Sequence, residues 1–236
     1  MADSHGQNIR TMFNRISPRY NLLNRLLSGF NDMRWRRKAV RLLGDLSGKT
    51  ALDLCCGTGD FLKILGDSYQ ENINLIGIDF AGEMLRIAGQ RLNLSGSGNL
   101  VLCQADALIL PCADKSVHAV TIGFGIRNII EKKDALQEII RALVPRGRLV
   151  IIEPAIPGNK IMAELFKFYF RKIMPVIGGI LSGDYKAYKY LDKSVESFPV
   201  PDEFCALMKE CGFINVQAHR QTFGTAIIYY GEKGDD

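Results

Sequence analysis

The chain has 236 residues, of which 47% are hydrophobic and 23% are charged; this composition is typical of a soluble globular protein with one sizeable core. Thirty Lys and Arg residues against 25 Asp and Glu residues give a formal net charge of +5, which is too mild to indicate nucleic-acid binding. No apolar run reaches the roughly 18 residues of a membrane-spanning helix, and residues 1–10 lack the blocks of a signal peptide. We therefore expect a cytoplasmic protein whose six cysteines are reduced thiols.

The positive charge is concentrated in two segments. Residues 8–41 hold nine basic residues and one acidic residue, and residues 160–193 hold seven basic and three acidic residues. Both segments carry apolar stripes at helical spacing. Pro18 interrupts the first stripe and predicts two short helices there, while Pro175 ends the second. We interpret both segments as amphipathic helices that cap another part of the molecule, and we expect an anionic partner to meet the protein through them.

From residue 49 onward, short apolar runs alternate with helical segments. The runs of strand length are residues 49–54, 73–78, 99–103, 117–122 and 148–152, and the clearest helices between them are residues 82–92 and 133–143. This alternation predicts a parallel sheet that is covered on both faces. After a helix at residues 202–211, strands at 213–218 and 225–230 are joined by a short connection, which indicates an antiparallel strand at the end of the sheet. The predicted fold is α/β, with a Rossmann-like, seven-stranded, mostly parallel sheet containing one antiparallel strand.

The strongest local signal is the segment ALDLCCGTGD at residues 51–60. Asp53 lies in the predicted strand, and Gly57, Thr58 and Gly59 form a turn that leads into a helix. Glycine lets the backbone turn sharply and lets a ligand approach the main chain. The start of the helix presents free N–H groups to that ligand.

Three further positions favour a nucleoside ligand at this loop. Asp79 ends the next strand about 20 residues later, where a carboxylate can accept hydrogen bonds from both ribose hydroxyls. Asp106 and Ala107 follow the third strand, at the place expected for an adenine amino group, and Gly123 follows the fourth. Because the carboxyl ends of parallel strands meet at one edge of the sheet, these residues are predicted to form one site.

Other interpretations of the same residues stay open. Asp53 is also compatible with a buried carboxylate that orients the loop, and Asp106 with a turn cap. A dinucleotide-binding unit would have G-x-G-x-x-G, but its third glycine position is Leu62 here. An RNA-binding module and a non-catalytic nucleoside-binding regulator are the remaining alternatives; the helical spacing of the apolar residues in the basic segment argues against RNA.

Two polar residues, Arg127 and Asn128, stand in the otherwise apolar stretch GFGIRNI after the fourth strand. This position is again at the carboxyl ends of the strands, where ligands bind in open parallel sheets. A surface loop is the alternative interpretation. The three histidines are scattered and no residues have metal-ligand spacing, so we predict neither a catalytic triad nor a metal site.

Several motifs together resemble the demethylmenaquinone and 2-polyprenyl-6-methoxy-1,4-benzoquinol C-methyltransferase family, over essentially the whole chain. They are RYNLLNRLLSGFNDMRW at 19–35, LDLCCGTGD at 52–60, GFGIRN at 123–128, YKYL at 188–191 and GF at 212–213. The resemblance implies that S-adenosylmethionine contacts Thr58, Asp79, Asp106, Ala107 and the residue at Gly123. The family usually has Ser at this last position and His where Asp32 stands, so only a backbone contact is expected from Gly123.

The resemblance also implies a polyprenylated quinol substrate, for which we favour demethylmenaquinol over the benzoquinol of ubiquinone biosynthesis. We expect Arg127 and Asn128 to hold the quinol oxygens, because a cation stabilises phenolate charge and an amide fixes orientation. Residues 1–48 would form an N-terminal helical lid over the substrate, and residues 49–236 the methyltransferase domain with a helical insertion at about 158–195. We expect transient contact with the inner face of a membrane, a homodimer and no nucleic-acid partner.

Overall fold

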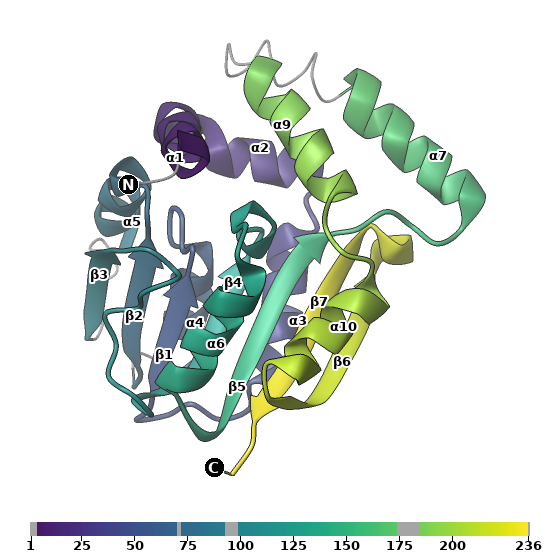
Figure 1. Cartoon of the computed structure of the whole chain (residues 1–236). Helices are drawn as coiled ribbons and strands as arrows, with labels where there is room; N and C mark the ends of the chain where they lie inside the picture. The colour runs from purple at the N-terminus through teal and green to yellow at the C-terminus, as the bar shows by residue number, and fades with distance from the viewer. Residues whose placement is uncertain (1–3, 70–71, 93–98, 174–184, 236) are drawn as a thin grey trace.

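The computed structural model describes residues 4–69, 72–92, 99–173 and 185–235. A seven-stranded sheet with the order β3-β2-β1-β4-β5-β7-β6 forms its centre (Figure 1). The strands are β1 (Thr50–Leu54), β2 (Asn74–Asp79), β3 (Leu100–Gln104), β4 (Val117–Gly123), β5 (Leu143–Pro154), β6 (Phe213–Gln221) and β7 (Ala226–Lys233). All seven predicted strands are confirmed, and the Rossmann-like architecture with them.

The single antiparallel strand is β7, which pairs antiparallel with both β5 and β6. It does not lie at the edge of the sheet, however, because β6 occupies that place. The sequences explain the arrangement. Nearly every residue of β7 is buried, whereas most residues of β6 are exposed or half-buried, and a strand that is apolar on both faces has to lie inside the sheet.

Helices cover both faces of the sheet (Figure 1). On one face lie α3 (Asp32–Leu42), α4 (Asp60–Ser68) and α5 (Gly82–Leu92), and on the other lie α6 (Lys132–Ala142) and α10 (Pro201–Glu210). The apolar residues of α3, among them Trp35 and Val40, pack into the same core cluster as Val150 and Ile228 of the sheet. The part of the N-terminal segment that contains α3 is therefore built into the core.

A second group of helices lies beyond the carboxyl ends of the strands (Figure 1). It consists of α1 (Ser4–Ile16), α2 (Tyr20–Leu27), α7 (Lys160–Phe168) and α9 (Tyr185–Glu196). A short turn that contains Pro18 separates α1 from α2, which confirms the two predicted helices. α7 continues as a π-helical turn, Tyr169–Ile173, and the predicted end at Pro175 lies outside the described residues. No helix in the described ranges is long and apolar enough to cross a bilayer.

Candidate active site

A cavity of about 520 Å³ opens at the carboxyl ends of β1, β2 and β4. These strands surround the point where the strand order reverses, which is the usual ligand site of an open α/β sheet, and the volume suits a nucleoside-sized ligand. Six of the predicted site residues line this cavity: Gly57, Asp79, Asp106, Ala107, Gly123 and Asn128. The covering helix α1 contributes Phe13 and other residues to the wall. The structure therefore brings most of the predicted site together.

Asp79 holds the glycine loop in place from the end of β2. Its Oδ2 atom accepts a hydrogen bond from the Gly57 N–H at 2.8 Å, and its Oδ1 atom accepts one from the Ala81 N–H at 2.9 Å. A carboxylate has about four acceptor sites, so Asp79 can still accept a hydrogen bond from a ribose hydroxyl. Burial raises the pKa of Asp79, while the backbone hydrogen bonds lower it.

The loop itself requires glycine at two places. Gly57 and Gly59 have φ values of +55° and +85°, in the left-handed region that side chains disfavour. A Cβ atom on Gly59 would also lie 2.8 Å from Cδ1 of Leu92. The turn leads directly into α4, whose first residues have no side-chain cap. Backbone N–H groups at such a start are available to a polar ligand, so the loop fits the predicted nucleoside.

Asp53, Thr58 and Gly59 do not line the cavity. Asp53 is buried, and the Thr121 hydroxyl of β4 donates to its Oδ1 atom at 2.7 Å. Its described hydrogen bond therefore joins two strands, and the carboxylate that bonds to the loop is Asp79 instead. Burial raises the pKa of Asp53 to about 7, although the Thr121 hydrogen bond opposes this.

Thr58 connects the loop to two helices. Its hydroxyl bonds to the Oδ1 atom of Asn21 on α2, and the Arg91 guanidinium on α5 donates to its carbonyl and hydroxyl at 2.6 and 3.0 Å. Arg91 also pairs with Asp60 at 3.0 Å, and Arg25 of α2 pairs with Asp60 at 3.3 Å. α2 and α5 are thus attached to the glycine loop through polar contacts.

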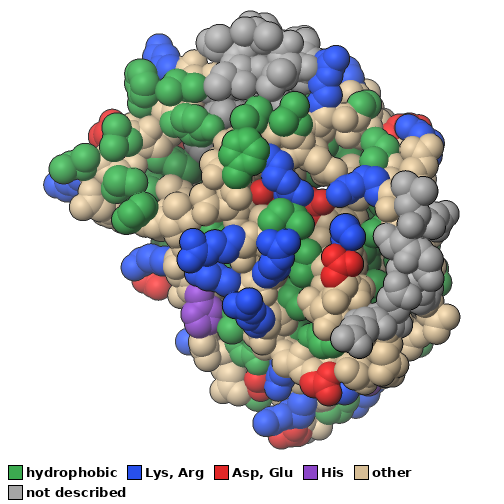
Figure 2. Space-filling model, turned by 180° about the vertical axis from the view of Figure 1, so that it is seen from behind, with side chains coloured by type: hydrophobic (Ala, Val, Ile, Leu, Met, Phe, Trp, Pro, Cys, Tyr) green, Lys and Arg blue, Asp and Glu red, His purple; other side chains and the backbone are tan. Residues whose placement is uncertain are grey.

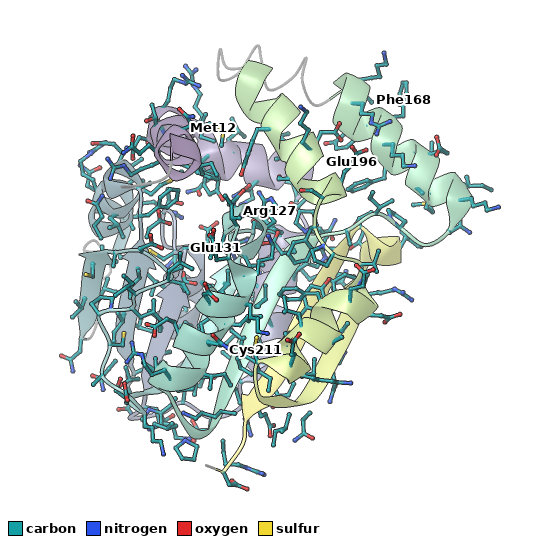
Figure 3. The ribbon with its side chains drawn as sticks, viewed as in Figure 1. Met12, Arg127, Glu131, Phe168, Glu196 and Cys211 are labelled. Atoms are coloured by element: carbon teal, nitrogen blue, oxygen red, sulfur yellow. The ribbon has the colours of Figure 1, made fainter. Side chains whose placement is uncertain are left out.

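Arg127 lies on a short 3-10 turn, Ile126–Asn128, after β4. Its guanidinium pairs with Glu153 of β5 at 2.9 Å and donates to the Phe124 carbonyl. Both side chains are buried, with 6% of Arg127 and 1% of Glu153 exposed. Within the described residues, the buried Nε atom of Arg127 has no hydrogen-bond partner. Arg127 is therefore held firmly while its Nε donor has no partner within the described residues; Figure 3 shows Arg127 between the sheet and the covering helices.

The next residue, Asn128, faces the cavity, and a tyrosine of α9 orients its side chain. The Tyr190 hydroxyl of α9 donates to its Oδ1 atom at 3.1 Å. Because burial raises the pKa of Tyr190, this hydroxyl keeps its proton and remains a donor. The amide nitrogen of Asn128 is 3.5 Å from the Phe124 carbonyl, which is too long for a strong bond. The Asn128 amide therefore still has a donor for a second partner.

A second cavity of about 390 Å³ adjoins the first. It lies between α2, α3, α7 and the loop after β6, and most of its wall is apolar: Leu27, Trp35, Phe124, Pro154, Met162, Leu165, Phe166 and Tyr169. Arg127 contributes a polar group to this wall. Phe124 lines both cavities, so Arg127, which lines the second cavity, and Asn128, which lines the first, stand at the junction between them.

Three residues of this site were not singled out from the sequence. Glu153 ends an apolar strand, Tyr190 lies in the YKYL motif and Tyr20 lies in the first amphipathic stripe. Tyr20 lines the first cavity, and burial raises its pKa although Arg127 opposes this. Its hydroxyl is therefore a hydrogen-bond donor at neutral pH. Of the three, Glu153 could have been found from the sequence, because a charged residue near the end of an apolar strand is unusual.

The fold and the site define an S-adenosylmethionine-dependent methyltransferase. The crystal structure of such an enzyme from Aquifex aeolicus has a similar fold, with a TM-score of 0.59, 18% identity and coverage of 84% of this chain and 88% of that chain. The model of the ubiE/COQ5 methyltransferase family matches residues 1–233, and the chain belongs to this family.

Two curated relatives are similar over nearly their whole length. The chain is 41% identical over 232 residues to the ubiquinone/menaquinone biosynthesis C-methyltransferase UbiE of Geobacter sulfurreducens, covering 97% of this chain and 90% of that protein. It is 42% identical over 222 residues to the demethylmenaquinone methyltransferase of Thermus thermophilus, covering 94% of this chain and all of that protein.

Proposed function

We propose that the protein transfers a methyl group from S-adenosylmethionine to a ring carbon of a polyprenylated quinol, and that this quinol is the naphthoquinol demethylmenaquinol. The observation that carries the proposal is the junction at Phe124, where a nucleoside-sized cavity meets an apolar one beside a buried arginine with a free donor. The names of both relatives support quinone chemistry, and the Thermus thermophilus relative is named for demethylmenaquinone. The benzoquinol remains the alternative because the name of the UbiE relative covers both quinones.

The cofactor would be held by the groups around the first cavity. Asp79 and the backbone at Gly57 are placed for the ribose, Asp106 and Ala107 for the adenine, and Gly123 for a backbone contact. Asp106 also accepts a hydrogen bond from the Leu108 N–H at 3.0 Å, so it caps its turn and faces the cavity at once. Bound S-adenosylmethionine supplies an electrophilic methyl group, and the protein has to align the attacking carbon with it.

The residues at the junction make the substrate carbon nucleophilic. A quinol ring carbon gains electron density when its hydroxyl loses a proton, and the free Nε–H of Arg127 can donate to the resulting phenolate oxygen. Glu153 keeps the guanidinium in place through its ion pair, so no reorganisation is needed as charge develops. Asn128, oriented by Tyr190, would hold the second quinol oxygen. The apolar cavity would take the first part of the prenyl tail.

The role of Arg127 is tested by removing its charge together with that of Glu153. We choose Arg127→Gln combined with Glu153→Gln because removal of one charge alone would leave the other buried and unpaired. Methyl transfer from labelled S-adenosylmethionine to a quinol should fall by about 10²–10³-fold, while cofactor affinity measured by calorimetry should stay within about twofold. An equal loss of cofactor affinity would show that Arg127 does not act on the quinol.

The choice of quinol is tested with wild-type protein. A naphthoquinol and a benzoquinol with the same prenyl tail are compared by their kcat/KM values. The proposal expects the larger value for the naphthoquinol. A larger value for the benzoquinol would overturn the naphthoquinol assignment and leave quinol methylation standing.

A further inference from the structure

α7 carries apolar side chains on two sides. Met162, Phe166 and Tyr169 face the second cavity. On the outside lie Ile161 and Phe168, which are 73% and 58% exposed, while Leu165, 58% exposed, stands at the rim of the cavity that it also lines; Figure 3 places Phe168 on the outer side of the helix. A helix that packs only on a protein core needs one apolar stripe, so packing within the described residues does not account for the outer row of α7.

Two exposed phenylalanines stand near the same cavity. Phe30 is 66% exposed and Phe223 is 81% exposed. Their neighbours Gly29 and Thr222 line the cavity. Both phenylalanines have positive φ values, +62° and +58°, a conformation that is unfavourable for a bulky side chain. Neither side chain is buried within the described protein, so both rings are available to an external apolar partner.

The surface next to these apolar residues is basic. α3 exposes Arg34, Arg37, Lys38 and Arg41, while its acidic residue, Asp32, is fully buried. In the part of the chain that the structure describes, Arg34 and Arg37 form no ion pair. Figure 2 shows a cluster of Lys and Arg side chains directly below the hydrophobic ones on this side of the molecule. The whole surface therefore combines a hydrophobic ridge with an unneutralised positive face.

We propose that this surface, formed by the outer row of α7, Phe30, Phe223 and the exposed face of α3, docks on an anionic lipid bilayer. The proposal rests on the proposed function, since a polyprenylated quinol is dissolved in a membrane. Aromatic and aliphatic side chains enter the interfacial layer of a bilayer while Lys and Arg contact anionic headgroups. Exposed Gly29, Leu165 and Thr222 line the apolar cavity, so the cavity opens within the docking surface and a prenyl tail can enter without crossing water.

A bilayer fits this surface better than two other occupants. Bound RNA would neutralise the arginines but leave the exposed phenylalanines and α7 in water. A second copy related by two-fold symmetry would bring two basic faces together, and like charges oppose such contact. An anionic membrane satisfies the hydrophobic ridge and the positive face simultaneously.

The proposal is tested by flotation of the full chain with vesicles of phosphatidylcholine alone or mixed with phosphatidylglycerol. We expect the protein to float with the anionic vesicles at low salt and to bind more weakly as salt rises. Protein that stays at the bottom of the gradient with anionic vesicles at low salt would overturn the proposal.

Variants locate the contact on the molecule. Phe30→Asn combined with Phe223→Asn removes both aromatic rings and places a residue that tolerates positive φ at each position. Vesicle affinity should fall about tenfold or more. Val101→Thr on β3, where the side chain is 58% exposed, is the matched control and should bind like the wild type. A fall of the same size in this control would contradict the assigned surface.

The positive face is tested in the same way. Arg34→Gln combined with Arg37→Gln should weaken binding about fivefold for each charge lost. Lys115→Gln combined with Lys209→Gln, which changes the same charge elsewhere on the surface, should have little effect. The phenylalanine and arginine variants could instead bind vesicles like the wild type but lose a dimer that light scattering detects in the wild type. That result would assign this surface to self-association and overturn the proposal.

Activity separates this inference from the proposed function. The Phe30→Asn, Phe223→Asn variant should methylate a water-soluble quinol with a short tail at the wild-type rate, and lose about tenfold with a long-tailed quinol in anionic vesicles. Equal rates of variant and wild type on the vesicle substrate would overturn docking while quinol methylation stood. If the wild type methylated neither quinol, the proposed function would be overturned. The flotation experiment would still test whether the protein docks on the membrane.

Discussion

Gly123 ends β4 against the ring of Phe61 and the guanidinium of Arg36. A Cβ atom at this position would lie 3.0 Å from Cε2 of Phe61 and 3.2 Å from a terminal nitrogen of Arg36. Arg36 in turn lies 5.3 Å from the centre of the Phe61 ring and 4.9 Å from that of Phe124. The serine that the family resemblance leads us to expect would be crowded here, because Phe61 and Arg36 would have to shift to admit its side chain.

We therefore expect Gly123→Ser to destabilise the protein. Overpacking of this kind costs about 1–3 kcal/mol, which urea denaturation would measure as a lower free energy of unfolding. Adding Phe61→Leu should recover part of the loss by clearing the space. Gly158→Ser is the control, because a Cβ atom there has nothing within 4 Å; equal stability of the two serine variants would refute the steric explanation.

Asp32 is another position where the sequence differs from what the family resemblance leads us to expect. It is fully buried, and both Arg25 and Arg36 pair with it. A carboxylate at this point neutralises two guanidinium groups, whose positive charges would otherwise have fewer negative partners in the protein. The departure is thus explained by the charges around it.

The pKa of Asp53 makes a prediction about stability and pH. Burial raises the pKa to about 7 in the folded protein from 3.8 in the unfolded chain, so the folded state holds a proton that the unfolded state has lost. Stability should therefore fall as pH rises from about 4 to about 7, by at most about 4 kcal/mol. Asp53→Asn keeps the acceptor for Thr121 and cannot ionise. Its unfolding free energy, measured across this range, should exceed that of the wild type increasingly toward pH 7; parallel curves would contradict the assignment.

At the scale of elements, α2 and α5 both hold the start of α4. Burial opposes ionisation of Asp60, but Arg36, Arg25 and Arg91 together keep its pKa below the usual range. The ion pairs from Arg25 and Arg91 to Asp60, and the hydrogen bonds of Thr58, fix the turn that ends at Gly59. The geometry of the cofactor loop therefore depends on a helix more than thirty residues earlier in the chain.

Asp60→Asn should accordingly weaken cofactor binding as well as stability. Removal of a carboxylate from this partly buried pair should cost about 3 kcal/mol of unfolding free energy, and calorimetry should show about tenfold weaker S-adenosylmethionine binding. Asp67→Asn on the same helix is the matched control, because the Lys63–Asp67 pair is exposed and is worth less than about 1 kcal/mol. Unchanged cofactor affinity in Asp60→Asn would show that α2 does not hold the loop.

At the scale of the whole molecule, segments from both halves of the chain cover the carboxyl ends of the strands. α1 lines the first cavity, α7 lines the second, and α9 reaches Asn128 through Tyr190. α10, by contrast, packs on the sheet (Figure 1), and none of its residues lines either cavity. The two cavities are therefore completed by helices that depend on tertiary contacts for their position.

This arrangement predicts where cofactor binding stabilises the protein. S-adenosylmethionine should slow amide hydrogen exchange in α1 and in residues 56–60, because these segments border the cavity that it fills. Exchange in α10 should not change. Mass spectrometry of the exchanging protein checks this, and equal exchange in α1 with and without cofactor would show that α1 does not cover the bound molecule.

The sequence alone was enough to predict the strand and helix order, the glycine loop and the nucleoside site. These features depend on local patterns: hydrophobic periodicity places the elements, and the carboxyl ends of parallel strands necessarily meet at one edge. Asp79, Asp106 and Gly123 could be assigned because each directly follows a predicted strand. Tyr20 and Tyr190 could not, since each reaches the site from a helix whose position depends on packing.

The charged residues also divide into a property that the sequence shows and contacts that only folding produces. The basic character of the two helical segments was evident from the sequence, but the partners of each charge were not, because Arg25, Arg36 and Arg91 meet Asp32 and Asp60 only after folding. Tertiary structure likewise placed β7 inside the sheet, gave Asp53 its partner on β4 and left the Nε atom of Arg127 free. Local chemistry determines which helices and strands form. Contacts between residues far apart in the chain determine which buried groups pair and which exposed side chains gather into one surface.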